Sequence, residues 1–114
     1  MMRLKEIAEK LDLEARCCSH KLDNEVKRGY SSDLMSDVIA HGQESDLWVT
    51  LQIHVNTVAV ASMKDLAGIL IIGGREPQEQ TIEKAEEENI PILVSKLTAF
   101  EVIGRLYNLG IPGI

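Results

Sequence analysis

The segment Gly73-Gly74-Arg75 is the strongest candidate for binding chemistry in this sequence. It follows the aliphatic run at residues 69–72, which is typical of a strand buried on both faces. Glycines let the backbone turn and approach a ligand closely, and a helix that starts just after them points unpaired N–H groups outward. Because Arg75 adds a cationic fork, the segment predicts a site for a phosphate-like anion.

Polar side chains also follow the neighbouring strands that we expect. In an open α/β sheet, ligands bind beyond the carboxyl ends of the strands. We therefore expect the loops 54–57, 73–77, 95–98 and 19–24 to meet at one edge of the sheet. Their polar side chains include Thr57, Ser95 and Lys96. The candidate ligand site comprises His54, Asn56, Gly73, Gly74, Arg75 and Thr98. An adenine nucleotide or another phosphate-like anion is the expected ligand.

Each candidate residue also has a structural interpretation without a ligand, and for the glycine pair we favour that interpretation. Gly73-Gly74 is then only a tight turn and Arg75 pairs with a nearby glutamate, because a lone glycine pair is a weak phosphate-loop signature. A single histidine such as His54 is more often a loop hydrogen-bonder than a base. We find no nucleophile elbow and no metal-ligand spacing. The sequence therefore predicts no catalytic residue, no metal and no cofactor, and we expect a protein that is not an enzyme.

The composition limits the class of protein. The 114 residues suffice for one domain, so we expect a single domain over residues 1–114. A net charge of −6 argues against nucleic acid as a partner, and no apolar run approaches the roughly 20 residues that a membrane span needs. Cys17 and Cys18 are adjacent, which disfavours a disulfide between them. A metal site of Cys17, Cys18 and His20 is conceivable, but small buried hydrophobes explain the two cysteines more simply. With no signal-peptide pattern at the start, we expect a cytoplasmic protein.

Hydrophobic periodicity predicts the elements that must position these residues. The first half is expected to form a helix at 2–11, strands at 13–18 and 25–30, and a helix at 34–41 capped by 31–33. The second half alternates strand and helix three times, at 47–53, 56–65, 69–72, 78–89, 91–94 and 98–109. Such alternation implies a mainly parallel α/β sheet of about five strands with helices on both faces and 69–72 at its centre.

Apolar side chains near the C-terminus and in one strand bear on assembly. Thr98 and Glu101 match a capping box for the last helix. That helix is predicted to bury Phe100, Val102, Ile103, Leu106 and Tyr107. Trp48 is either core or a subunit contact, and we favour core because a sheet covered on both faces has no wet side. Ile111 and Ile114 are expected to be exposed and within reach of a partner subunit.

Several short motifs resemble the DRTGG domain family. The motifs are Trp48-Val49-Thr50, His54-Val55-Asn56, Asp65-Leu66-Ala67-Gly68, Ile72-Gly73-Gly74-Arg75-Glu76-Pro77, Ile90-Pro91-Ile92-Leu93, Thr98-Ala99-Phe100-Glu101 and Gly104-Arg105-Leu106-Tyr107. The resemblance covers the chain from about Gly29 to Ile111. Only the glycine pair Gly73-Gly74 matches the name motif Asp-Arg-Thr-Gly-Gly.

The resemblance implies a fold and a class of function. Domains of this family are similar to the N-terminal domain of HPr kinase/phosphorylase, which implies a three-layer α/β fold. They accompany phosphotransacetylases and CBS-containing pyrophosphatases and also occur alone. This implies a non-catalytic regulatory or ligand-sensing domain. Together with the loop set, it leads us to expect a homodimer with an enzyme as a further partner. The alternative is an assembly adaptor without a small-molecule ligand.

Overall fold

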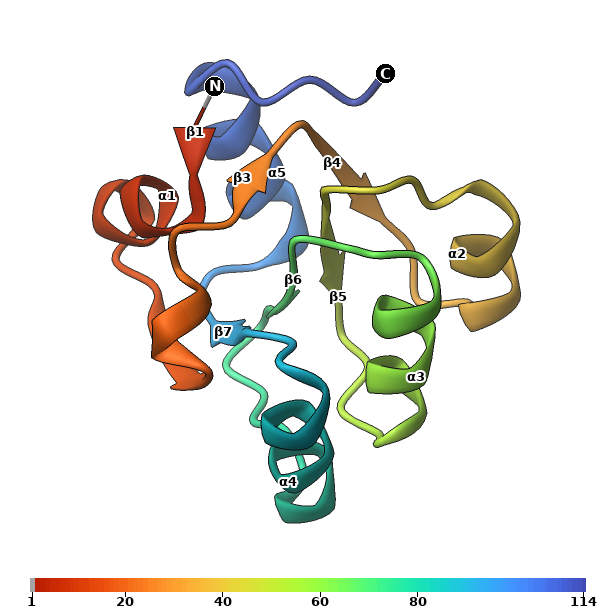
Figure 1. The fold of residues 1–114 in the computed structure, drawn as a ribbon. Helices are drawn as coiled ribbons and strands as arrows, with labels where there is room; N and C mark the ends of the chain where they lie inside the picture. Colours follow the sequence, from red (N-terminus) through yellow and green to blue (C-terminus); the bar gives the residue numbers. More distant parts are fainter. Residues whose placement is uncertain (1) are drawn as a thin grey trace.

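The computed structural model describes residues 2–114 and forms three layers (Figure 1). The elements are β1 (Met2–Arg3), α1 (Leu4–Leu11), β2 (Glu14–Cys17), η1 (Ser19–Lys21), β3 (Glu25–Val26), β4 (Arg28–Ser31), α2 (Met35–His41), β5 (Asp46–Thr50), α3 (Asn56–Met63), β6 (Gly68–Ile71), α4 (Glu79–Glu88), β7 (Ile92–Val94) and α5 (Ala99–Asn108). The main sheet has the strand order β2-β7-β6-β5-β4, and only β2 runs antiparallel to its neighbour. The predicted α/β class and the five-stranded, mostly parallel sheet are confirmed.

The central strand is β6, as the aliphatic run predicts. All four of its residues are buried, and its neighbours on both sides, β5 and β7, are parallel to it. A four-residue run without a polar break can occupy such a place because helices cover both faces of the sheet. The exit of β6, which leads into the glycine turn, therefore lies in the middle of the carboxyl edge of the sheet.

Each face of the sheet has its own core. On one face, α1 and α5 contribute Leu4, Ile7, Val102 and Leu106 to a cluster with alternate strand residues such as Leu70. On the other face, α2, α3 and α4 cover a second cluster, with helix residues Val38, Val58 and Ala85. Trp48 belongs to this second cluster and is fully buried, so the interpretation as core is confirmed. Its Nε1 donates a hydrogen bond of 2.8 Å to the carbonyl of Ser32.

The strand expected at residues 25–30 is divided in two. Glu25–Val26 pairs with β1 in a small separate sheet, and Arg28–Ser31 forms the edge strand of the main sheet. The cap expected from residues 31–33 is wrong, because Leu34 occupies the N-cap of α2 without a side-chain bond. Asp33 instead accepts hydrogen bonds from Thr50 Oγ1 at 2.9 Å and from the Leu51 amide at 2.8 Å. Asp33 therefore ties the end of β5 to the β4–α2 connection.

Two further boundaries differ from the sequence prediction. β5 ends at Thr50, three residues early, where the Thr50 hydroxyl accepts a hydrogen bond from the Gln52 amide at 3.1 Å and the chain turns away from the sheet. The helix predicted at 78–89 begins at Glu79 and ends at Glu88, one residue inside each predicted end. At α5, Thr98 stands at the N-cap position but makes no side-chain cap bond.

The prediction for α5 is wrong for three side chains. Val102 and Leu106 are buried against the sheet, as predicted. Phe100 is 92% exposed, Tyr107 71% and Ile103 40%. The apolar residues of α5 span nearly half of the helix circumference, and a period of 3.6 residues cannot tell which part of that broad arc packs inward. Near the C-terminus, Ile111 is buried at 5% exposed, contrary to expectation, whereas Ile114 is fully exposed.

Within residues 2–114, no helix combines the length and the apolar character needed to cross a membrane.

Candidate functional site

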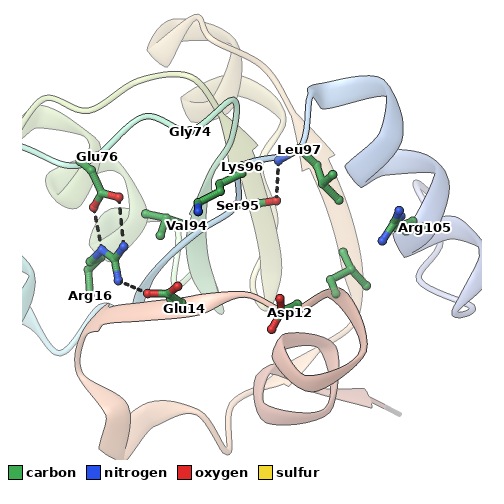
Figure 2. Close-up of a pocket in the computed structure, with 11 residues that line it drawn as sticks. Asp12, Glu14, Arg16, Gly74, Glu76, Val94, Ser95, Lys96, Leu97 and Arg105 are labelled. Atoms are coloured by element: carbon green, nitrogen blue, oxygen red, sulfur yellow. Dashed lines mark hydrogen bonds and ion pairs between the residues drawn. The ribbon is translucent and has the colours of Figure 1, made fainter.

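A cavity of about 280 Å³ lies at the carboxyl edge of β6 and β7. Its wall is built from the end of α1, the start of β2, the glycine turn, the loop after β7, and α5 (Figure 2). The charged side chains that line it are Asp12, Glu14, Arg16, Glu76, Lys96 and Arg105. Leu11, Val94 and Leu97 supply an apolar part of the wall. A concave site at this edge is where an open α/β sheet usually binds its ligand.

The glycine turn closes onto the loop that follows β7. Gly73 and Gly74 both adopt positive φ angles, of 71° and 73°, which only glycine takes without strain. Their amides donate hydrogen bonds to the carbonyls of Leu97 at 2.8 Å and Ser95 at 2.9 Å. The two N–H groups are therefore engaged by the protein. No residue of α4, which begins at Glu79, lines the cavity, so the helix N-terminus that the sequence suggested as an anion site lies outside it.

Arg16 makes more hydrogen bonds than the other two cations of the cavity, Lys96 and Arg105 (Figure 2). Its Nε and Nη2 atoms donate to the two carboxylate oxygens of Glu76 at 2.6 and 3.0 Å, and Nη1 donates to Glu14 at 2.9 Å. These hydrogen bonds lower the pKa of Glu76 and raise the pKa of Arg16. The glutamate of the glycine turn thus pairs with Arg16 from β2, and the pairing of Arg75 with a glutamate is not found among residues 2–114.

Lys96 and Arg105 complete the positive side of the cavity. Lys96 is exposed and makes no ion pair with any of the residues from Met2 to Ile114, whereas Arg105 pairs with Glu101 at 2.8 Å. Figure 2 shows Lys96 between Arg16 on one side and Arg105 on the other. An anion in the cavity therefore finds one ammonium group available at once and two guanidinium groups that it must share with acids.

The structure brings only part of the expected site together. Gly74 lines the cavity and Gly73 lies beside it in the same turn. Arg75 is exposed and is not among the lining residues, and Thr98 is exposed at the start of α5. Their role in ligand binding stays a prediction.

His54 lies on a separate loop, between β5 and α3, Asn56 is the first residue of α3, and both are exposed. This loop docks on the start of α4, because the carbonyl of Ile53 accepts hydrogen bonds from the Gln78 amide at 3.3 Å and from Thr81 Oγ1 at 2.7 Å. Thr57 is buried and its hydroxyl donates back to the His54 carbonyl at 2.7 Å. Neither His54 nor Asn56 lines the cavity.

The loop 19–24 lies at the opposite edge of the sheet, so its expected place at the site is wrong. The reason is the antiparallel direction of β2, which reverses the ends of this strand. Asn24 instead donates a hydrogen bond of 3.0 Å to the carbonyl of Ala67, at the start of β6. Asp12 and Glu14, at the other end of β2, take the place at the cavity.

Cys17 and Cys18 form a separate cluster with Glu86, whose carboxylate oxygen lies within 4.8 Å of both sulfurs. Both thiols are buried and donate to backbone carbonyls, Cys17 to Ile90 at 3.5 Å and Cys18 to Ala85 at 3.3 Å. Burial raises the pKa of Cys17, and it raises the pKa of Cys18 to about 12. The thiols are therefore protonated and pack as small apolar groups. His20 contacts Asn89 at 3.0 Å instead of joining them.

The comparison with protein families decides the family. The DRTGG domain profile matches residues 6–109. This chain belongs to the DRTGG domain family. No curated protein matches the DRTGG chain.

Among solved structures, the DRTGG chain is similar to the CBS and DRTGG domains of the regulatory region of Clostridium perfringens pyrophosphatase, complexed with its activator diadenosine tetraphosphate. The TM-score is 0.74 with 18% sequence identity, over 96% of this chain and 47% of that chain. At this identity the likeness shows the fold alone. The DRTGG chain spans less than half the length of the pyrophosphatase region that it matches.

Proposed function

We propose that this DRTGG domain is a non-catalytic regulatory domain that senses a phosphate-bearing small molecule, such as an adenine nucleotide, in the cavity beside Gly74. The observation that carries the proposal is the ammonium group of Lys96, which lacks an acidic partner within residues 2–114 and lines the cavity with Arg16 and Arg105. The similar pyrophosphatase regulatory region, which was solved with a dinucleotide activator, supports a nucleotide as the class of ligand.

The size and charge of the cavity limit how the ligand sits. A volume of about 280 Å³ is at the small end of the roughly 300–1,000 Å³ usual for ligand pockets. It accommodates a phosphate group and part of a nucleoside. The lining is electrically balanced, with Arg16, Lys96 and Arg105 opposed by three carboxylates. Inorganic phosphate therefore gains little net attraction, and a nucleotide gains more because its base can contact Leu11 and Leu97.

The side chains at the cavity are arranged for binding. Ser95 is the only hydroxyl among the lining residues within the described range 2–114, and its Oγ accepts a hydrogen bond of 3.1 Å from the Leu97 amide. No histidine lines the cavity among residues 2–114, and the Ser95 hydroxyl makes no hydrogen bond to the carboxylates that do, so no base is paired with this hydroxyl. A nucleophile without a base is weak, which favours recognition over turnover.

Calorimetric titration tests this function. Inorganic phosphate, AMP, ADP and ATP are each titrated into the wild-type domain and into Lys96→Ala, with Lys27→Ala as the control because Lys27 is exposed at the other edge of the sheet. A nucleotide is expected to bind, with affinity reduced at least about tenfold by Lys96→Ala and unchanged by Lys27→Ala. Arg75→Ala is expected to have a smaller effect than Lys96→Ala. Absence of heat with all four compounds, or equal affinity for Lys96→Ala and wild type, contradicts the proposal.

A second candidate function is an assembly adaptor that recruits an enzyme. The observation that favours it is the outward apolar face of α5, where Phe100 and Tyr107 are 92% and 71% exposed. Copurification of the tagged domain from its own cells, repeated with Phe100→Ser, separates the two functions. An enzyme retained by the wild type and lost with Phe100→Ser supports the adaptor, and equal recovery with both proteins contradicts it.

A further inference from the structure

Four residues of α5 form an outward apolar face, which we call the α5 stripe: Phe100, Ile103, Gly104 and Tyr107. A helix turns by about 100° per residue, which puts these four on one side and the buried pair Val102 and Leu106 on the other. Phe100 is almost wholly exposed to solvent. Aromatic side chains gathered on the surface of a small domain usually mark an interaction site.

We propose that the α5 stripe binds the α5 stripe of a second copy of this chain, with the two helices antiparallel about a twofold axis near Ile103 and Gly104. Such an isologous contact uses the same patch on both copies and closes at two subunits. The inference goes beyond the proposed sensing function, because it concerns a different face and needs no ligand.

The order of side chains along the α5 stripe is complementary to that of a second α5 helix packed antiparallel to it. In an antiparallel pair, Phe100 of one helix lies opposite Tyr107 of the other, and Ile103 lies opposite Gly104. A Cβ placed on Gly104 meets no atom within 4 Å, so the space beside Gly104 is open. The Ile103 side chain of the second copy can fill that space, and the small residue lets the two helices approach closely.

The charges beside the stripe are self-complementary. Glu101 and Arg105 lie together on one flank of the stripe and pair with each other at 2.8 Å. When two helices pack antiparallel, the same flank of each helix faces its copy. Glu101 of one copy then lies beside Arg105 of the other, in both directions. The chain has a net charge of −6, but α5 carries one acid and one base, so two acidic chains can meet here without repulsion.

A groove lies where the antiparallel arrangement needs one. It has a volume of about 70 Å³ and is lined mainly by apolar atoms of Tyr30, Val49, Ile103, Tyr107 and Ile111, between α5 and the edge strand β4. Phe100 is about 10.5 Å from Tyr107 along the helix, at a rise of 1.5 Å per residue. Reversal of the second helix therefore brings its Phe100 to this groove, as an aromatic anchor in a pocket.

Sedimentation equilibrium over a range of concentrations tests the dimer. The wild type is expected to pass from 12.7 kDa to twice that mass as concentration rises. Phe100→Ser is expected to weaken the dimer at least about tenfold, the effect of removing a buried aromatic anchor. Leu34→Ser is the matched control, because Leu34 is 68% exposed at the N-cap of α2 and lies outside the stripe. A wild type that stays monomeric up to about 1 mM, which corresponds to roughly −4 kcal/mol of association, overturns the proposal. So does a dimer that Phe100→Ser leaves unchanged.

Disulfide trapping tests the orientation. Ile103→Cys is expected to cross-link two copies on oxidation, because the twofold axis passes close to this position. Phe100→Cys alone is expected not to cross-link, since a disulfide needs Cα atoms within about 7 Å and the two copies of this residue lie at opposite ends of the contact. Efficient cross-linking of Phe100→Cys, or none with Ile103→Cys, contradicts the antiparallel arrangement.

Charge reversal gives a second measurement that does not alter the apolar contact. Glu101→Arg and Arg105→Glu are each expected to weaken the dimer, and the double variant is expected to restore it. Lys96→Ala is expected to leave the dimer unchanged, so failure of ligand sensing and failure of the dimer are distinguishable. A double variant that dimerises less than either single variant contradicts the flank pairing.

Discussion

The backbone amide of Gly74 donates a hydrogen bond of 2.9 Å to the carbonyl of Ser95. This bond joins the exit of the central strand to the exit of the next strand and fixes the rim of the cavity. It also means that the glycine turn shapes the cavity without offering its amides to a ligand. In the proposed function, anion recognition therefore depends on side chains, chiefly Lys96.

The glycine turn is expected to tolerate substitution poorly. Gly73→Ala and Gly74→Ala each put a Cβ on a residue with positive φ, at about 1–2 kcal/mol per substitution. Gly73→Ala is expected to be the worse, because its Cβ would lie 3.3 Å from Cδ2 of Leu51, whereas the Cβ at Gly74 meets nothing within 4 Å. Urea denaturation measures both. Equal stability of the wild type and the two variants contradicts the strained geometry.

A buried ion pair is expected to dominate the stability of the β4–β5 edge. Arg28 donates to both carboxylate oxygens of Asp46 at 2.8 and 2.6 Å, and Asp46 is 1% exposed. Asp46→Asn leaves the guanidinium without its counter-charge, with a predicted loss of about 3 kcal/mol. The control is Lys84→Gln, since its ion pairs with Glu87 and Glu88 are exposed and contribute less than about 1 kcal/mol. Similar unfolding midpoints for the two variants refute this ranking.

The Arg16–Glu76 pair predicts an acid-dependent stability. The pKa of Glu76 is lowered from 4.5 by hydrogen bonding to Arg16. A lowered carboxyl pKa contributes stability that is present above pH 4.5 and lost as the pH falls through the folded value. The wild type is expected to exceed Glu76→Gln in stability at pH 7 by less than about 1 kcal/mol, because the pair is partly exposed. The difference should vanish in acid. If the stability difference between wild type and Glu76→Gln grew as the pH fell below 4.5, it would contradict this prediction.

The two thiols are expected to be inert in the folded protein. The pKa of Cys18 is raised to about 12 by burial, so the reactive thiolate is rare at pH 8. Alkylation by iodoacetamide should be at least about a hundredfold slower in buffer than in urea. Ser36→Cys, which adds an exposed thiol on α2, should react at the unfolded rate. If iodoacetamide alkylated Cys18 at comparable rates with and without urea, the Cys18 thiol would not be buried in the folded protein.

Much of the fold could be predicted from sequence, because an unbroken aliphatic strand is stable only in the middle of a sheet that is covered on both faces. Four aliphatic residues in a row before Gly73 require cover on both faces, and Trp48 lies in the core for the same reason. The direction of β2 could not be predicted, since a four-residue strand with Glu14 and Arg16 carries no directional signal. The Arg16–Glu76 pair, 60 residues apart in sequence, follows from that direction and was missed with it.

The cavity that we propose as the site could be anticipated only in part, for a related reason. The sequence indicated the edge of the sheet and the glycine turn, and Lys96 lay in one of the expected loops. Hydrophobic periodicity could not reveal that Phe100 and Tyr107 face outward, because the apolar arc of α5 is wider than the face that packs against the sheet. Which side chains of a helix are exposed depends on the tertiary packing of that helix against the sheet.

Chemical-shift mapping of the ¹⁵N-labelled wild-type domain with ATP tests the central claim most directly, because it reports on every loop in one measurement. We expect shifts concentrated at the amides of Gly74, Ser95 and Lys96, with His54 and Asn56 unchanged. An unchanged spectrum at millimolar ATP, or shifts centred away from the Gly74–Lys96 rim, would contradict it.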